Sequence, residues 1–198
     1  MGDEAGMLAT RLMFRFGSIA AIMSAKAEAL RACATPGETW PDKLLAIRSL
    51  VRSGLDESVR RSPLDTTDER FHEWLRGQFM GLREERLMAM FGDARGMLIR
   101  SDWIALGGEH WVLASARSLF HQALACDAKF IVLAHNHPSG VASPSMDDVR
   151  STRRVADLAH ALGIELTDHL VVGASEIQSL AAIGALGKPH VHRVARRA

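Results

Sequence analysis

The sequence predicts an α/β protein: a mixed sheet with helices packed against it, preceded by a small all-helical region. Two observations lead to this fold class. From Thr10 to about Leu55, apolar residues recur at steps of three and four, which is the spacing of amphipathic helices. From residue 85 onward, short apolar runs of strand length alternate with helical segments in the order β, β, α, β, α, β, β.

The first 80 residues are expected to form short helices without a sheet. The helical pattern is interrupted at "TPGETWPD", where Pro36, Gly37 and Pro41 predict a turn. A polar stretch and one amphipathic segment follow. The chain is therefore expected to divide into a helical region (1–60), a linker with a connecting helix (61–80), a sheet domain (81–187) and a basic tail (188–198).

The strands of the sheet domain are expected from local signals. "RLMAMFG" and "GMLIRS" are short apolar runs around Asp93 to Gly96, as in a β-hairpin, and "DWIALGG" continues the second strand. A helix over "SARSLFHQALACDA" leads to "KFIVLAHN", a run typical of a buried strand. The segment "SPSMDDVRSTRRVADLAHALG" predicts a long helix that ends at Gly163, and "IELTDHLVVG" and "EIQSL" predict two more strands.

Composition excludes several classes of protein. Hydrophobic residues make up 47% and charged residues 24% of the chain, and the formal net charge is +1, which excludes an intrinsically disordered protein. No run of eighteen apolar residues predicts a membrane span, and the first residues lack the features of a secretory signal. The cysteines, Cys33 and Cys126, are far apart and form no CxxC pair, as suits a reducing compartment. A cytoplasmic protein is expected.

One segment, "LAHNHPSGVASPSMDDVR", predicts a metal site. In a strand, side chains two residues apart point the same way, so His135 and His137 are expected to share one face. A turn from Pro138 to Pro144 can bring the first turn of the next helix to the strand end, with Asp148 as a third ligand. Two nitrogens and one carboxylate oxygen leave a fourth tetrahedral position, which is typical of catalytic zinc.

The same residues also have a purely structural interpretation. A single HxH pair is weak evidence for a metal. Ser145 and Asp148, three residues apart, are the spacing of a helix capping box, and Pro144 is common near a helix start. Each feature alone favours structure, whereas their combination at fixed spacing favours a site.

The combined spacing resembles the JAMM (MPN+) metalloprotease signature, H-x-H, seven residues, S, two residues, D. The surrounding "LAHNHPSG", "TRR" and "LGIELTDHLVVG" resemble the bacterial RadC group of JAB-domain proteins, over roughly residues 80–183. The resemblance implies a JAB/MPN-like, cytidine-deaminase-like domain with one Zn²⁺ bound by His135, His137 and Asp148. It also implies a catalytic glutamate before the first strand, which falls on Glu85, with Glu84 as the alternative register.

The resemblance further implies a mechanism and a substrate class. Zinc would activate a water, Glu85 would act as general base and then general acid, and Ser145 would donate to the oxyanion. Asn136, Asp168 and His169 are expected to orient ligands, although a buried pair without a catalytic role is an equal alternative for the last two. The implied function is hydrolysis of a peptide or isopeptide bond in a peptide or protein substrate. The long insertion of the ubiquitin-specific relatives is absent.

Other functions stay open at this point. The helical region resembles the helix-hairpin-helix module that precedes RadC domains, so DNA repair or processing with weak DNA contact is an alternative. Its turn, however, has only one glycine, and the first 80 residues balance eleven basic against eleven acidic residues. A non-catalytic interaction module is a third hypothesis. No membrane contact is expected, and the sequence does not indicate an oligomeric state.

Overall fold

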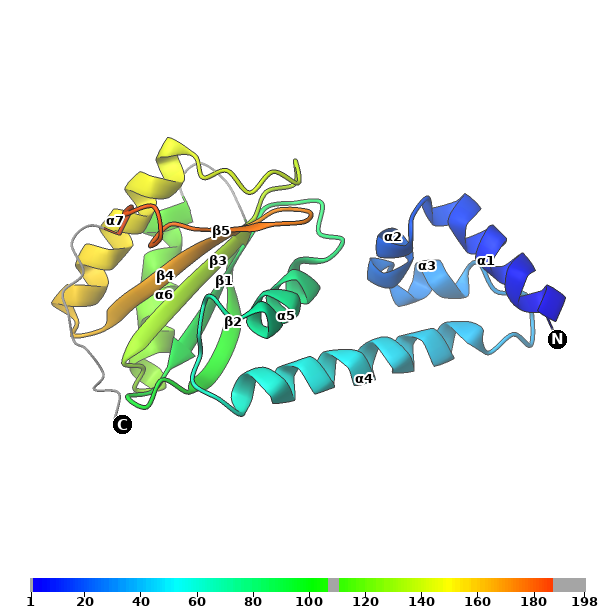
Figure 1. Cartoon of the computed structure of the whole chain (residues 1–198), viewed down its shortest axis with the longest axis horizontal. Coiled ribbons are helices and arrows are strands. Elements are labelled where there is room, and N and C mark those ends of the chain that lie inside the picture. The colour runs from blue at the N-terminus through cyan, green and yellow to red at the C-terminus, as the bar shows by residue number, and fades with distance from the viewer. Residues whose placement is uncertain (1, 107–110, 187–198) are drawn as a thin grey trace. The chain divides into compact units, whose positions relative to one another are not determined.

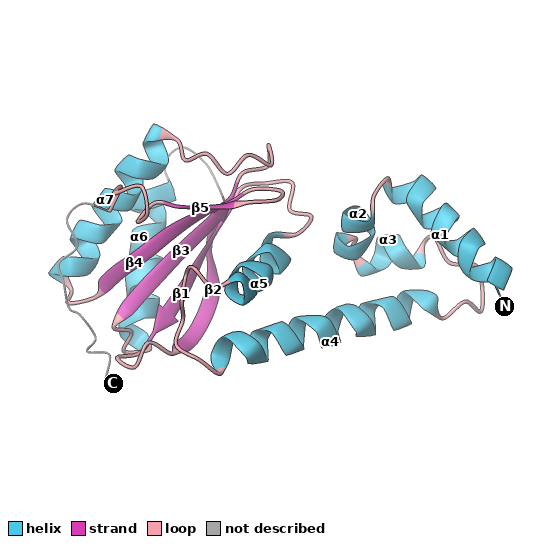
Figure 2. Ribbon diagram, viewed as in Figure 1, coloured by secondary structure: helices cyan, strands magenta, loops and turns pink. Residues whose placement is uncertain are grey.

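The computed structural model describes residues 2–106 and 111–186 and divides into two compact units, Met1–Arg83 and Glu84–Ala198 (Figure 1). The first unit is all-helical and the second is built on a five-stranded sheet (Figure 2). This confirms the predicted fold class. The basic tail expected at 188–198 lies outside the described residues.

The helical unit contains five helices, with more breaks than the sequence pattern predicts. They are α1 (Gly2–Phe16), α2 (Ile19–Ser24), α3 (Ala27–Arg31), α4 (Trp40–Arg60) and α5 (Glu69–Phe79). Gly17 ends α1 in a left-handed conformation (φ 80°), and its N–H donates to the Met13 carbonyl. Ser18 then caps α2 by accepting from the Ala21 N–H. Apolar periodicity alone missed this break because it continues across Gly17.

The turn predicted at "TPGETWPD" lies before α4 and is organised by Glu38. The Glu38 carboxylate accepts from the Thr35 N–H at 2.7 Å, from Arg11 at 2.9 Å and from the Trp40 indole N–H at 3.1 Å. These interactions, the Thr35 backbone bond first, lower the pKa of Glu38 to about 2. Pro41 lies in the first turn of α4, where its missing N–H costs nothing. The chain's own carboxylate therefore occupies this turn.

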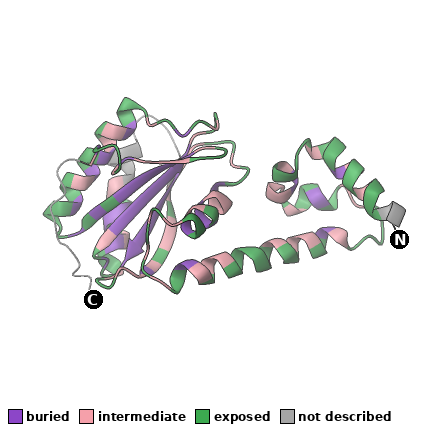
Figure 3. Ribbon diagram, in the orientation of Figure 1, coloured by how far each residue is buried: buried purple, intermediate pink, exposed green. Residues whose placement is uncertain are grey.

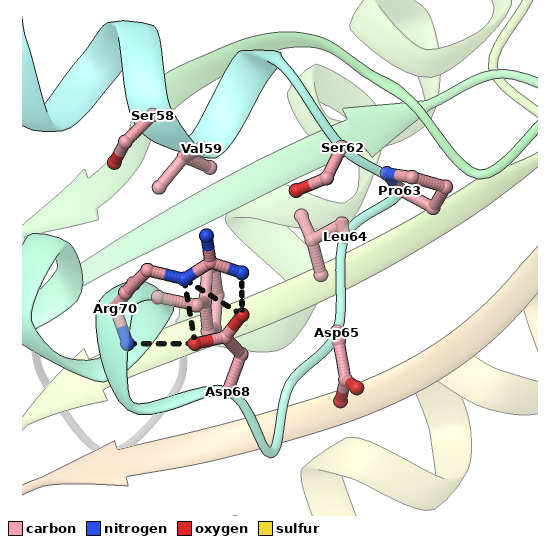
Figure 4. A pocket seen from close by; sticks show the side chains of 9 residues that line it. Ser58, Val59, Ser62, Pro63, Leu64, Asp65, Asp68 and Arg70 are labelled. Carbon is pink, nitrogen blue, oxygen red and sulfur yellow. Dashed lines mark hydrogen bonds and ion pairs between the residues drawn. The ribbon is translucent and has the colours of Figure 1, made fainter.

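A small pocket lies between the end of α4 and the start of α5 (Figure 4). Its accessible volume of about 10 Å³ corresponds to a single water molecule. The charged groups of Asp68 and Arg70 that line it are paired with each other at 2.6 Å. It is therefore a packing feature and too small for a peptide.

The second unit is a mixed sheet in the order β2-β1-β3-β4-β5. The pair β3–β4 is parallel, and the other pairs are antiparallel. The predicted order of strands and helices is confirmed, with bounds β1 (Arg86–Gly92), β2 (Leu98–Leu106), α6 (Trp111–Ala125), β3 (Phe130–Asn136), α7 (Met146–Ala161), β4 (Glu165–Val172) and β5 (Ile177–Ser179).

The core of this unit lies between the sheet and the two helices α6 and α7. Alternate residues of β1 and β3 point into it, among them Phe91 and Leu133, and they share one buried cluster with Leu119 of α6 and Val155 of α7. Figure 3 shows the central strands of the sheet as mostly buried. Both helices therefore cover the same face of the sheet. Because β3 and α7 share this core, the end of the strand and the start of the helix are held in a fixed relation.

The predicted turn signals are also confirmed. Asp93 accepts from the Arg95 and Met97 N–H groups and closes the β1–β2 hairpin, with Gly96 in the left-handed region (φ 84°). Gly163, also left-handed (φ 70°), follows the end of α7. Within the described residues, no helix combines the length and apolar character that crossing a membrane requires.

Candidate metal centre

Three side chains from β3, the following loop and α7 converge at the carboxyl end of β3. His135 Nε2 lies 3.0 Å from His137 Nε2 and 3.3 Å from Asp148 Oδ1, and His137 Nε2 lies 3.5 Å from Asp148 Oδ2. The three residues form a group able to hold a metal ion. The carboxyl end of a parallel strand pair, beside a helix N-terminus, is a common position for ligand sites in α/β proteins.

His137 reaches this group by a different route from the expected one. The strand ends at Asn136, so His137 lies just past β3 rather than on a shared strand face. Its ring is oriented by the loop instead, because His137 Nδ1 lies 2.9 Å from the Val141 carbonyl. The two imidazoles still converge, with ring centroids 4.9 Å apart.

The hydrogen bonds of His137 determine which of its nitrogens faces the site. A carbonyl oxygen only accepts, so His137 Nδ1 must carry the hydrogen that it donates to Val141. In the neutral ring, Nε2 then has a lone pair directed at His135 Nε2 and Asp148. His135 Nε2 lies 3.0 Å from His137 Nε2, so the contact requires a proton or a cation between the two nitrogens. The donor set therefore suits a cation.

The spacing also fits a tetrahedral ion. Zinc binds histidine nitrogen at about 2.0–2.1 Å in tetrahedral geometry, so neighbouring ligand atoms lie about 3.3 Å apart. The separations of 3.0 Å between the two Nε2 atoms and 3.3 Å between His135 Nε2 and Asp148 Oδ1 are near this value, and His137 Nε2 lies 3.5 Å from the other carboxylate oxygen, Oδ2. The two nitrogens and one oxygen leave a fourth position that none of the three residues fills.

Asp148 takes part in both of the arrangements expected from the sequence. A full capping box forms at the start of α7: the Ser145 side chain accepts from the Asp148 N–H, and Asp148 Oδ2 accepts from the Ser145 N–H. The same carboxylate faces both imidazoles and is 95% buried. The cap therefore holds the carboxylate in place at the site rather than competing with it.

Glu85 lies immediately before β1 and interacts electrostatically with Asp148 and His137. Partial burial raises its pKa, the Asp148 carboxylate raises it further, and His137 opposes part of this rise. Glu84, in contrast, is exposed. Glu85 thus feels the charges of Asp148 and His137, and its catalytic role stays a prediction.

Asn136 fixes the backbone around Glu85 relative to β3. Its side-chain oxygen accepts from the Arg86 N–H at 2.9 Å, and its side-chain nitrogen donates to the Glu84 carbonyl at 3.1 Å. The two bonds are made by the residues directly before and after Glu85, so they hold its backbone against the end of β3. Asn136 is thus placed to orient Glu85 rather than a metal ligand.

The other expected residues have distinct positions. Ser145 donates its hydroxyl hydrogen to Asp148 Oδ2 at 2.7 Å, so a role with an oxyanion requires that hydroxyl to turn. His169 contacts His135, with His169 Nε2 2.8 Å from His135 Nδ1. The Asp168 carboxylate instead accepts from Ser179 Oγ and the Ala181 N–H. Asp168 therefore stabilises the turn after β5.

Sequence reasoning missed Thr152, which is fully buried beside the site. Its hydroxyl lies 2.6 Å from His169 Nδ1 and donates to the Asp148 carbonyl at 2.6 Å. The available signal was its position four residues after Asp148, which places both residues on the same face of a helix.

Burial sets the protonation of the inner histidines. It lowers the pKa of His135 below its usual value, against the opposing effect of Asp148 and with a further lowering by His137. Burial also lowers the pKa of His169, as do His135 and His137. Both rings are therefore neutral at pH 7, and His135 can offer a lone pair without first losing a proton.

The loop that orients His137 packs closely against Gly173, which gives a testable consequence. A Cβ atom on Gly173 would lie 2.7 Å from the Gly140 carbonyl oxygen and 2.9 Å from the Ala142 nitrogen. Both are backbone atoms, so Gly173→Ala must displace the loop. We expect a loss of about 1–3 kcal/mol in the free energy of unfolding and weaker metal binding, measured by thermal denaturation and chelator competition.

Gly54→Ala is the matched control for this substitution. Gly54 is exposed within α4 with nothing within 4 Å of an added Cβ, so alanine should leave stability unchanged or raise it by up to about 1 kcal/mol. If Gly173→Ala is as stable as this control and binds metal as tightly as the wild type, the loop that orients His137 does not depend on its close contact with Gly173.

The fold and site together define an α/β domain with a candidate metal centre at the end of its sheet. The chain belongs to the family of the RadC-like JAB domain, whose model matches residues 65–185. That match begins before the boundary between the two compact units and so includes α5.

Named relatives agree with this family. A UPF0758 protein of Cupriavidus necator is 34% identical over 91% of this chain and 79% of its own length. UPF0758 proteins of Paraburkholderia xenovorans and Burkholderia mallei are 32% and 34% identical, each over 92% of this chain and over 72% and 66% of their own lengths. These names describe no activity.

Proposed function

We propose that the protein is a zinc-dependent metallohydrolase of the JAMM type that cleaves a peptide or isopeptide bond. The observation that carries this proposal is the convergence of three electron-pair donors, from His135, His137 and Asp148, on one point with a fourth position open. Three protein ligands and one open position are typical of catalytic rather than structural zinc.

The residues around this point supply the remaining chemistry. When bound, zinc makes a water-derived nucleophile available near neutral pH. Glu85 accepts a proton from the attacking water as the new C–O bond forms. It then passes that proton to the amide nitrogen as the C–N bond breaks. Ser145, at the start of α7, donates to the carbonyl oxygen once its hydroxyl turns from Asp148.

The raised pKa of Glu85 suits this role. A general base works best when its pKa lies nearer the working pH than that of an ordinary carboxylate. Burial and the Asp148 carboxylate both move Glu85 in that direction. Zinc would counteract part of this shift through its own charge.

The alternative is a DNA-processing role, and the helical unit gives it little support. In the turn before α4, Glu38 accepts the Thr35 N–H and pairs with Arg11, and its lowered pKa keeps it ionised. A fixed negative charge at this turn repels a phosphate. A single metal ion is also less suited to phosphodiester cleavage than a metal pair.

We place the activity in the cytoplasm. Cys33 and Cys126 are both free thiols in the structure, which is typical of a reducing compartment.

The first test is metal analysis of protein purified without added zinc, followed by assays on peptide libraries and on labelled DNA. We expect about one zinc per chain and cleavage of peptides that stops on chelation and returns with zinc. Absence of metal uptake, even at excess zinc, would refute the proposal. Metal-dependent cleavage of DNA alone would favour the alternative.

A further inference from the structure

A continuous series of hydrogen bonds joins two of the proposed metal ligands through the protein interior. His135 Nδ1 lies 2.8 Å from His169 Nε2, and His169 Nδ1 lies 2.6 Å from Thr152 Oγ1. Thr152 Oγ1 in turn lies 2.6 Å from the carbonyl oxygen of Asp148. His135 is 2% exposed, and His169 and Thr152 are fully buried, so water does not share these contacts.

The last contact determines the direction of the whole series. A carbonyl oxygen only accepts, so the single hydrogen of the Thr152 hydroxyl is donated to Asp148. Thr152 Oγ1 must then accept from His169 Nδ1–H. In a neutral ring this leaves His169 Nε2 as an acceptor, and His135 Nδ1 must carry the hydrogen between them.

The opposite direction is disfavoured by the same geometry. If the Thr152 hydrogen pointed to His169, two oxygen acceptors would face each other at 2.6 Å without a hydrogen between them. That arrangement is costly inside a protein because the low dielectric strengthens the repulsion and no water relieves it.

We propose that Thr152 and His169 are positioning residues that fix His135 in the Nδ1–H tautomer and so present its Nε2 lone pair to the metal. The tautomer is a property of the chain itself, but its use rests on the metal site proposed above. The network begins at the backbone of one ligand, Asp148, and ends on the ring of another, His135. The orientation of the two is therefore coupled through Thr152.

Two substitutions of Thr152 separate the hydroxyl from the packing. Thr152→Ser keeps the hydroxyl and removes a methyl group, whereas Thr152→Val keeps the shape and removes the hydroxyl. Without the Thr152 hydroxyl, His169 Nδ1–H loses the acceptor 2.6 Å away that favours this tautomer. We therefore expect Thr152→Val to shift the hydrogen of His169 to Nε2, from which it donates to His135 Nδ1. His135 then carries its own hydrogen on Nε2, where the metal would bind.

The tautomers are measured by two-bond ¹H–¹⁵N correlation spectra of the histidine rings in metal-free protein at pH 7. His169 is the reporter, because it does not bind the metal. We expect Nδ1–H in the wild type and in Thr152→Ser, and Nε2–H in Thr152→Val. Zinc affinity, from competition with a chromophoric chelator, should fall by about 10- to 100-fold in Thr152→Val and stay within about threefold of wild type in Thr152→Ser.

Either measurement can overturn the inference. An Nε2–H tautomer of His169 in the wild type contradicts the proposed direction, and equal zinc affinities of the two variants contradict the proposed role. Circular dichroism and the thermal midpoint identify a variant that fails to fold, in which case the wild-type spectrum still decides the tautomer. If the wild type binds no zinc, the proposed function fails, but the His169 spectrum tests this network independently.

Discussion

Asp148→Asn is expected to reduce bound zinc from about one per chain to background. The carboxylate is the only anion among the three ligands, and it lies 3.3 Å from His135 Nε2 and 3.5 Å from His137 Nε2. The amide is a much weaker zinc ligand and does not neutralise the ion's charge. The loss of affinity should exceed the 10- to 100-fold that is typical of removing a partner of a ligand. Metal analysis and chelator competition measure it.

Asp147→Asn is the control, since it removes the same charge one residue away. Asp147 is exposed and pairs with Arg150, so its replacement should leave zinc content unchanged. Asp148→Asn retains an oxygen that can accept from the Ser145 N–H, so most of the helix cap should survive. Unchanged zinc content in Asp148→Asn would mean that Asp148 lies beside the two histidines for structural reasons and does not bind the metal.

The elements of the sheet domain were predictable because each carries a local signal. The β1–β2 hairpin follows from Asp93 and Gly96, and the end of α7 follows from Gly163, whose positive φ suits glycine. The sheet order was not predictable in this way. The placement of β1 between β2 and β3 depends on pairings that run from Gly92 with Phe130 to Leu87 with His135, and no local pattern encodes pairings so far apart in the chain.

The candidate metal-binding group was predictable, but the residues that orient it were not. His135, His137 and Asp148 stand out because their combined spacing with Ser145 resembles the JAMM signature, although each feature alone has a structural interpretation. Asn136 and Thr152, in contrast, are common residue types, and their partners become visible only when β1, β3, β4 and α7 are assembled. The orientation of His137 also depends on a backbone carbonyl, at Val141, which sequence cannot indicate.

The assembled site also changes how the cap of α7 is understood. From sequence, a capping box and a metal ligand were alternatives for Ser145 and Asp148. In the structure they coincide, because the carboxylate's Oδ2 accepts the Ser145 N–H while its Oδ1 lies near His135. A helix N-terminus stabilises a carboxylate through its unpaired N–H groups and its dipole. The cap therefore helps to hold the Asp148 carboxylate at the candidate site.

Glu85→Gln is expected to lower turnover by about 10²- to 10⁴-fold while leaving zinc bound, because glutamine cannot accept the proton of the attacking water. Glu84→Gln is the matched control: it lies one residue away and is exposed, so its turnover should equal that of the wild type. The measurement is the rate of cleavage of a peptide substrate from the library assay, with metal content determined on the same samples. If only Glu84→Gln loses turnover, the general base is Glu84. That result would contradict the assignment of Glu85, whose backbone is held by the bonds of Asn136 to the residues on either side of it.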